Sequence, residues 1–310
     1  MKKLFTILAV AATLVSCAKE DVVREAEGEA IQFGNAFVEN STRAAADPSY
    51  NATNLTSFKV YGAVEGVNIF NGNVVTKGDA DYSEAWTVVD APTQYWIAGA
   101  DYIFDAVVDA TETVINTATG LPTTLKYNTA TQTDMLHNRV TTNGKPTDND
   151  GLVAFTFKHL LSKVKFTVTN NTAADATNYR YTITDIAITN ANLTGDYAVT
   201  GTWSNLTTGS YTITPDMTIA SNSTEECAAE VLLIPGTNKV GMTFKVNIQM
   251  KNGSNWETIE TYPKTYSEVI ALAANTAYNF AVTVGLNDTI QFTAKPVGSW
   301  TSNADTTLQY

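Results

Sequence analysis

LVAFTFKHLLSKVKFTV, residues 152–168, contains two short runs in which apolar and polar residues alternate. Alternation with a period of two is typical of a β-strand that has one face in a hydrophobic core and the other in solvent. Only the residues KHLL separate the two runs, LVAFTF and SKVKFTV. We therefore expect one strand to close a first domain here and another to open a second domain, with the boundary near His159.

Outward from this segment, the same alternation recurs along most of the chain. Thr, Val, Tyr, Phe and Asn are abundant in the runs, Gly, Asn, Asp and Pro separate them, and helical periodicity is almost absent. These features are typical of antiparallel β-sandwiches. The chain has 310 residues, more than the roughly 100–200 of a usual domain. We therefore predict an all-β protein with two antiparallel β-sandwich domains.

Two segments lack this alternation. Residues 18–29 are charged and without periodicity, so we expect a flexible tether there. Residues 111–150 are polar and rich in Thr and Asn. We expect this second segment to be a surface excursion of the first domain, although it is long enough to hold short strands.

The first 17 residues have the features of a bacterial lipoprotein signal peptide. Lys2 and Lys3 precede an apolar run that ends in LVSC, with Cys17 last. The run is shorter than the roughly 20 residues that cross a membrane, and polar residues follow at once. We expect cleavage before Cys17 and acylation of its thiol and amine, palmitate included, which would hold the mature chain on a membrane. An ordinary secreted protein with a chance cysteine is the weaker alternative, because Leu14 and Ser16 also match the lipobox.

Composition and charge argue against two further features. The chain has 31 acidic and 19 basic residues, a formal net charge of −12, so nucleic acid is disfavoured as a partner by repulsion. Only two cysteines are present. If Cys17 carries lipid, Cys227 has no partner for an intramolecular disulfide, and we expect it to be a small buried side chain.

No motif favours catalysis, a cofactor or a metal. His137 and His159 are the only histidines. His159 lies between two expected strands, where a structural hydrogen bond is favoured over general-base work. The sequence DNDG at residues 148–151 contains part of a calcium loop without its remaining ligands, so we expect a turn. We predict that the protein is not an enzyme and needs no cofactor.

Several blocks, taken in order, carry a resemblance to a known family. They are the lipobox at Cys17, NSTRAAA around Arg43, QTDMLHN with FTFKHLLSKVKFTV, VLLIPG at 231–236, and the ending LAANTAYNFAVTVGLNDTIQFTAKPVGSW. Together they resemble the fimbrillin family, the type V pilins of Gram-negative bacterial surfaces. The resemblance implies two transthyretin-like sandwich domains, export as an outer-membrane lipoprotein, and polymerisation by strand exchange into fimbriae that support adhesion. It also implies tip and anchor subunits as partners, and a trypsin-like, Arg-specific protease that cuts downstream of the first strand.

Arg24 and Arg43 are the candidates for this cleavage, and the position of the first strand favours the bond between Arg43 and Ala44. A cut after Arg24 would leave the strand AIQFGNAFV, residues 30–38, in place. A cut after Arg43 would detach this strand together with the lipid. The small residues and the Asp-Pro turn signal that follow are typical of an exposed loop that a protease can bind. Without the other blocks, a plain surface arginine would be preferred.

The first strand is predicted to be apolar on one face. Alternation places Ile31, Phe33 and, after a one-residue adjustment at Gly34, Asn35 and Phe37 on that face. Each fully buried Ile or Phe contributes about 1.5–3 kcal/mol. Loss of the strand would leave an apolar groove with unpaired edges, which recruits another strand.

The end of the chain offers a replacement. The tripeptide IQF of residues 31–33 recurs as Ile290, Gln291 and Phe292. A tail of residues 289–310, with Ile290, Phe292, Val297 and Trp300 as its apolar residues, is our candidate donor strand. The alternative, that residues 289–300 form the last strand of the second domain, stays open. Both hold if the tail is stored on its own domain before exchange.

These expectations divide the chain into a signal peptide (1–17), a tether with a removable first strand (18–43), an N-terminal sandwich (44–158) and a C-terminal sandwich (159–310). The predicted function is a fimbrial shaft subunit that forms a head-to-tail homopolymer at the cell surface. The alternative is a permanently anchored surface lipoprotein. It would be either a fimbrial anchor or accessory subunit, or a protein that binds glycans or host ligands through exposed aromatic residues and long loops. Trp86, Tyr95 and Trp96 are candidates for a sugar-stacking platform, but aromatic residues in short strands are usually part of the core.

Overall fold

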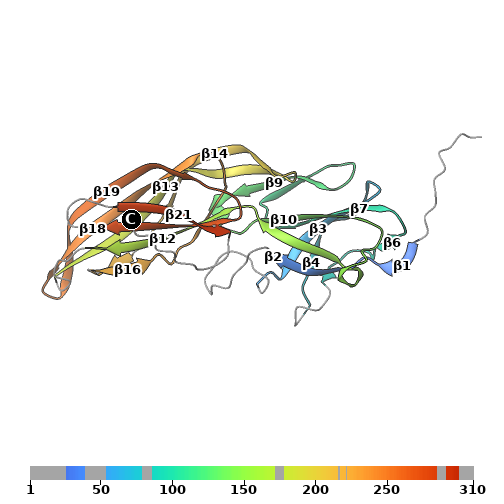
Figure 1. Cartoon of the computed structure of the whole chain (residues 1–310), viewed down its shortest axis with the longest axis horizontal. Coiled ribbons are helices and arrows are strands. Elements are labelled where there is room, and N and C mark those ends of the chain that lie inside the picture. The colour runs from blue at the N-terminus through green and yellow to red at the C-terminus, as the bar shows by residue number, and fades with distance from the viewer. Residues whose placement is uncertain are drawn as a thin grey trace, which may run out of the picture.

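The computed structural model describes residues 26–38, 54–78, 86–171, 178–215, 217–220, 222–284 and 291–299. Almost all regular structure in these ranges is β-strand, arranged in an elongated molecule (Figure 1). The all-β prediction is confirmed. The helices of the described ranges are two single 3-10 turns, η1 (Thr129–Thr131) and η2 (Asn149–Gly151). Within the same ranges, no helix is long and apolar enough to cross a membrane.

The first half of the chain forms a seven-stranded sheet and a two-stranded sheet. The larger sheet has the order β2-β11-β10-β7-β3-β4-β5, and the smaller one pairs β1 with β6. The strands are β1 (Ala26–Ala30), β2 (Phe33–Val38), β3 (Ser57–Val64), β4 (Val67–Thr76), β5 (Thr87–Val88), β6 (Tyr95–Ile97), β7 (Asp101–Val108), β10 (Leu136–Asn143) and β11 (Val153–His159). An isolated bridge between Phe33 and Trp86, the residue before β5, joins the two ends of the larger sheet around a common core.

Strand β11 shows how the sequence produces this core. Val153, Phe155 and Phe157 are buried, whereas Thr156 and Lys158 between and after them are exposed. The run LVAFTF thus places every second side chain inside, as its alternation predicts.

Two further sheets enclose another core, and they combine the strands of the second half of the chain with the hairpin β8–β9 of the first half. One sheet has the order β16-β12-β20-β21, with β17 also on β12, and the other has the order β19-β18-β13-β9-β8, with β14 and β15 also on β13. The strands are β8 (Glu112–Ile115), β9 (Pro122–Asn128), β12 (Ser162–Asn170), β13 (Tyr179–Ala198), β14 (Thr202–Ile213), β15 (Met217–Ile219), β16 (Ser223–Glu226), β17 (Val231–Leu233), β18 (Lys239–Asn252), β19 (Asn255–Ala271), β20 (Thr276–Val284) and β21 (Gln291–Ser299). Phe166, Phe244 and Phe280 meet in their core.

Most ladders are antiparallel, as predicted, but β2 runs parallel to β11 and β12 runs parallel to β20. A hairpin gives antiparallel neighbours, whereas strands that come from distant parts of the chain can pair in either direction. The two parallel ladders involve such distant strands.

The expectation that residues 111–150 form a surface excursion is wrong. Strand β10 lies inside the first sheet, between β7 and β11. The hairpin β8–β9 leaves that sheet and pairs through β9 with β13 of the second half. The sequence LHNRVTTN of β10 is polar at every exposed position. A strand of this composition is not recognised from sequence, because its neighbours in the sheet, and not its own apolar residues, bury half of it.

The expected tether is also partly wrong, because residues 26–29 belong to β1. Backbone pairing with β6, and not apolar alternation, orders this charged stretch.

A third apolar cluster joins the two halves. It combines Tyr61 and Val107 of the first sheet and Leu125 of β9 with Leu160 and Leu232 of the second half. In Figure 1, β9 lies at this junction. The hairpin that crosses over therefore ties the two sandwiches together through both backbone pairing and apolar packing.

Candidate assembly site

The segment from β1 to β2, residues 26–38, lies between two other parts of the first sandwich and is hydrogen-bonded to both. We call the space that this segment occupies the slot. On one side, the Ile31 N–H donates to the Gln94 carbonyl oxygen (2.7 Å) and the Trp86 N–H donates to the Phe33 carbonyl oxygen (2.8 Å). On the other side, the Val153 N–H donates to the carbonyl oxygen of Gln32 (2.9 Å). If this segment were removed, two backbone edges would open at once.

The side chains of the segment complete the aromatic core. Phe33 is fully buried, and its ring centroid lies 5.5 Å from that of Phe70, 5.8 Å from Phe104 and 5.9 Å from Phe155. Ile31 is also buried. The expectation that these two residues face the interior is therefore confirmed.

Phe37 does not face the interior, and this part of the prediction is wrong: 51 % of Phe37 is exposed, whereas only 6 % of Val38 is. The cause is a one-residue bulge. Gly34 is opposite Ala154 and Phe37 is opposite Thr156, so β2 holds one residue more than β11 over the same distance. A bulge reverses the alternation beyond it, and Val38 takes the inward position.

The three buried side chains, Ile31, Phe33 and Val38, set the cost of an empty slot. At about 1.5–3 kcal/mol each, they contribute roughly 5–9 kcal/mol. This is comparable to the whole stability of an ordinary domain, about 5–15 kcal/mol. The slot therefore needs a strand, from this chain or another.

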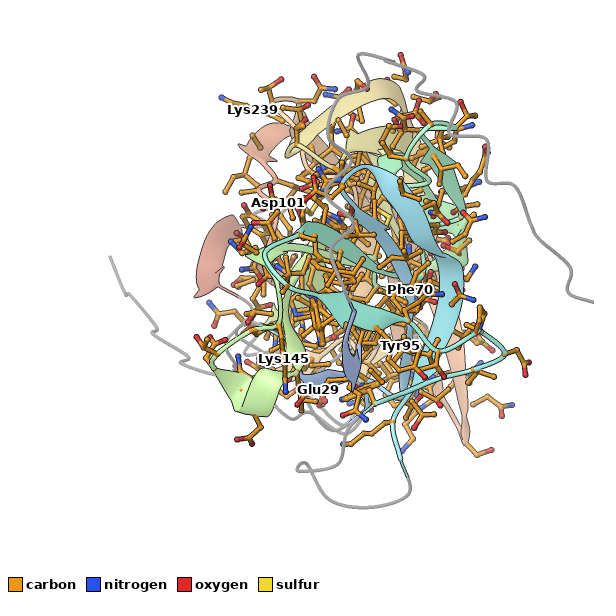
Figure 2. All side chains as sticks on the ribbon, turned by 90° about the vertical axis from the view of Figure 1, so that its right-hand side faces the viewer. Glu29, Phe70, Tyr95, Asp101, Lys145 and Lys239 are labelled. Atoms are coloured by element: carbon orange, nitrogen blue, oxygen red, sulfur yellow. The ribbon has the colours of Figure 1, made fainter. Side chains whose placement is uncertain are left out.

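One ion pair fastens the start of the segment. Glu29 of β1 binds Lys145, which belongs to the loop between β10 and η2 (Figure 2). The stem of Lys145 lies over Gly151, where an added Cβ would be 2.1 Å from the Lys145 Cε. A glycine at this position thus makes room for the lysine. Neither Glu29 nor Lys145 was singled out from the sequence, because one charged residue in a polar stretch gives no signal.

The remaining predicted site residues are placed as follows. Cys17, Arg43, Ala44, Ile290 and Trp300 lie outside the described residues. Phe292 and Val297 belong to β21, which pairs with β20 at the edge of its sheet, with Phe292 opposite Val282. Residues 291–299 thus form a strand on their own half of the chain.

Both histidines are engaged by buried carboxylates. His137 Nε2 lies 2.8 Å from Asp105 Oδ1, and Arg139 donates two further bonds to the same carboxylate, at 2.9 and 2.7 Å. His159 Nδ1 lies 2.8 Å from Asp134 Oδ2, as expected for a structural hydrogen bond. Among the residues that the structure describes, no group of His, Cys, Asp or Glu is arranged to hold a metal ion.

The aromatic residues proposed as a glycan platform do not form one. Trp86 and Trp96 are buried, and only Tyr95 of the three is exposed. Trp86 packs against Phe58 at 5.1 Å, and Trp96 packs against Tyr102 at 4.8 Å, between ring centroids. Both tryptophans serve the core of the first sandwich.

Cys227 is buried, as predicted, and burial raises the pKa of its thiol above the ordinary value. A raised pKa leaves little thiolate at neutral pH, which fits an unreactive structural side chain.

Comparisons with known proteins agree with this architecture. A family model described as "Fimbrillin-like" matches residues 42–300. Solved structures with a similar fold include a putative cell adhesion protein from Bacteroides uniformis (TM-score 0.54, 16 % identity, 89 % of this chain and 100 % of that chain). A fimbrial protein from Bacteroides vulgatus (TM-score 0.54, 13 % identity, 86 % and 99 %) and a putative cell adhesion protein from Bacteroides ovatus (TM-score 0.52, 18 % identity, 89 % and 99 %) are also similar.

No curated protein matches the sequence. The likeness to the solved structures shows the fold, and the family model, which spans most of the chain, supports a structural role in fimbriae at the cell surface. The chain belongs to the fimbrillin-like family.

Proposed function

We propose that this protein is a shaft subunit of cell-surface fimbriae that polymerises by donor-strand exchange. The β1–β2 segment leaves the first sandwich, and the tail of another copy, residues 289–310, takes its place. The observation that carries the proposal is that this segment is bonded along both edges and buries Ile31, Phe33 and Val38 in the core. Such a segment completes the sandwich yet lies at one end of the chain, before the only arginine between it and the rest of the fold.

Maturation is proposed to begin at the membrane. Acylated Cys17 would hold the precursor on the outer membrane until an Arg-specific protease cuts between Arg43 and Ala44. That single cut would release the lipid and separate β1–β2 from the rest of the chain. Tip and anchor subunits would join the same polymer.

The tail has a position from which it can be donated. In the described part of the chain, β21 is an edge strand whose only partner is β20. To leave its own sheet, β21 breaks the hydrogen bonds of one ladder. In the slot of a second copy, the tail forms hydrogen bonds along both of its edges. Such a head-to-tail contact need not close on itself, and repetition without closure produces a filament.

The test uses the precursor without its lipid and an Arg-specific protease. Cleavage of the wild-type chain is expected to produce a ladder of polymers on an unboiled gel. The substitution Arg43→Ala should abolish the ladder, and Arg24→Ala, the matched control, should keep it. A ladder that persists in R43A would move the cleavage site elsewhere.

A second variant tests the donor. A chain that lacks residues 289–310 should be cleaved and remain monomeric. Polymerisation of this truncated chain would overturn the role of the tail.

A further inference from the structure

We infer that the donor tail enters the slot of a second copy in one register, and that Lys145 selects this register by binding Asp288 of the incoming tail. This inference rests on the proposed strand exchange. It goes further by naming which residue of the tail occupies each position, and which side chain at the mouth of the slot recognises the donor.

The register follows from the side chains that the structure buries. Ile31, Phe33 and Val38 are the apolar residues that β1–β2 places in the core. The tail contains the same three residues at the same spacing, Ile290, Phe292 and Val297. The third match became visible only with the bulge in β2, because the alternation alone points to Phe37 and not to Val38.

Apart from exposed Gln32, which recurs as Gln291, the other positions of the strand do not share this identity. Half-exposed Phe37 corresponds to Pro296, and Ala36 corresponds to Lys295. Proline lacks an N–H and is tolerated where a ladder is interrupted by a bulge. The three large apolar side chains that the slot buries, Ile31, Phe33 and Val38, are thus all repeated in the tail, as expected if both segments are shaped by the same cavity.

The acidic residue that precedes each copy of the IQF repeat is the group that Lys145 binds. Glu29, two residues before Ile31, binds Lys145. In the same register, the tail has Asp288, again two residues before its Ile290. Lys145 belongs to the loop after β10, so it stays with the sandwich when β1–β2 leaves. A lysine at the mouth of the slot then favours an acidic donor, in a chain whose net charge of −12 otherwise repels a second copy.

One position requires an adjustment. Thr293 of the tail corresponds to Gly34, where an added Cβ would lie 2.4 Å from Leu152 Cδ1. Leu152 is partly exposed, so its terminal methyl group can rotate outward. The added Cβ also lies 3.2 Å from Leu152 Cβ, which requires a backbone shift of a few tenths of an ångström. Substitution Leu152→Ala should therefore ease entry of the tail, while leaving the resident glycine in the precursor unaffected.

The test is a charge reversal within the lipid-free precursor. Lys145→Glu and Asp288→Lys each place like charges at the mouth of the slot, and the double variant restores an opposite pair. After cleavage, we expect each single variant to form polymers whose dissociation constant is about three- to tenfold higher than that of the wild type. The double variant should return to within about twofold. Both effects should fade in high salt because the pair is partly exposed.

Two controls separate this pair from other effects of charge. Glu29→Lys breaks the ion pair of the precursor, but residue 29 departs with the cleaved segment, so the polymer should be as stable as the wild type. Asp305→Lys changes the charge of the tail outside the register and should also have no effect. Circular dichroism of each precursor verifies that it is folded before cleavage.

The outcomes distinguish the inference from the function on which it rests. If the cleaved wild type forms no polymer, strand exchange itself fails. If the wild type polymerises and the double variant is as weak as the single variants or weaker, strand exchange stands and the pairing of Lys145 with Asp288 is overturned.

Discussion

Gln132 and Leu232 pair across the junction of the two sandwiches as if the glutamine side chain were part of a strand. The Leu232 N–H donates to Gln132 Oε1 (2.9 Å), and Gln132 Nε2 donates to the Leu232 carbonyl oxygen (3.1 Å). Gln132 follows η1, and its backbone is in the left-handed region, with φ of 49°. This conformation directs the side chain out of the loop and toward Leu232. Two blocks that carry the family resemblance, QTDMLHN and VLLIPG, therefore meet in space.

This contact predicts a measurable stability effect. Gln132→Ala removes both bonds and leaves the partly buried backbone of Leu232 without its partners, so the free energy of unfolding should fall by about 2 kcal/mol. Urea denaturation of the uncleaved precursor measures this change. Gln94→Ala is the matched control, because among the described residues the hydrogen bond of that side chain is a long, exposed one of 3.4 Å to the Pro92 carbonyl oxygen. Its effect should stay within about 0.5 kcal/mol. Equal effects of the two substitutions would contradict a stabilising role for the hydrogen bonds between Gln132 and Leu232.

The bulge in β2 predicts opposite results at two nearby phenylalanines. Phe33→Ala creates a cavity among Phe70, Phe104 and Phe155 and should destabilise the first sandwich by about 3–5 kcal/mol. Phe37→Ala, on the exposed face, should cost less than about 0.5 kcal/mol. Thermal or denaturant unfolding of the precursor compares them directly. A large effect at Phe37 would show that the alternation runs through β2 without the bulge.

Tyr127 predicts a dependence of stability on alkaline pH. Its hydroxyl donates to the Thr133 carbonyl oxygen (2.6 Å) at the junction between the sandwiches, and burial raises the pKa of this phenol. Because the folded state holds the proton more tightly than the unfolded state, this contribution is complete below the ordinary tyrosine pKa of about 10. It is lost as pH rises above that value.

The measurement is the difference in unfolding free energy between about pH 8 and pH 10.5, on either side of that ordinary pKa. The wild type should lose stability over this interval, and Tyr127→Phe should lose less, after an initial cost of about 1 kcal/mol for the missing hydrogen bond. The same pH dependence in both proteins would assign the titration to other groups.

Cys227 predicts slow thiol chemistry. Burial both shields the sulfur and raises its pKa, so a thiol reagent at neutral pH should modify the native protein far more slowly than the unfolded protein. The rate should follow the fraction of unfolded chain as urea is added. The protein for this measurement begins after Cys17, so that Cys227 is its only thiol. Rapid modification of this native protein would place Cys227 at the surface.

Much of this fold could be predicted because burial leaves a local signature in a strand. The alternation of Val153, Phe155 and Phe157 with polar neighbours predicts β11, and the same rule predicts the burial of Ile31 and Phe33. Strand β10 escaped prediction because a polar strand between two partners is held by its ladders, and those partners are distant in sequence. The one-residue adjustment expected at Gly34 left Phe37 on the inner face for a related reason, since only the register against β11 shows that the extra residue places Val38 there instead.

The sequence by itself determined the all-β class, the apolar character of the first strand, and the repeat of IQF near the two ends of the chain. These properties are local: they depend on which residues follow one another at a spacing of two. Only the tertiary structure decided that β1–β2 lies between two backbone edges, that the hairpin β8–β9 crosses to the second sandwich, and that Glu29 meets Lys145. Each of these depends on contacts between residues far apart in the chain, and such contacts are fixed by the shared core and by the pairing of strands, which no short stretch of sequence encodes alone.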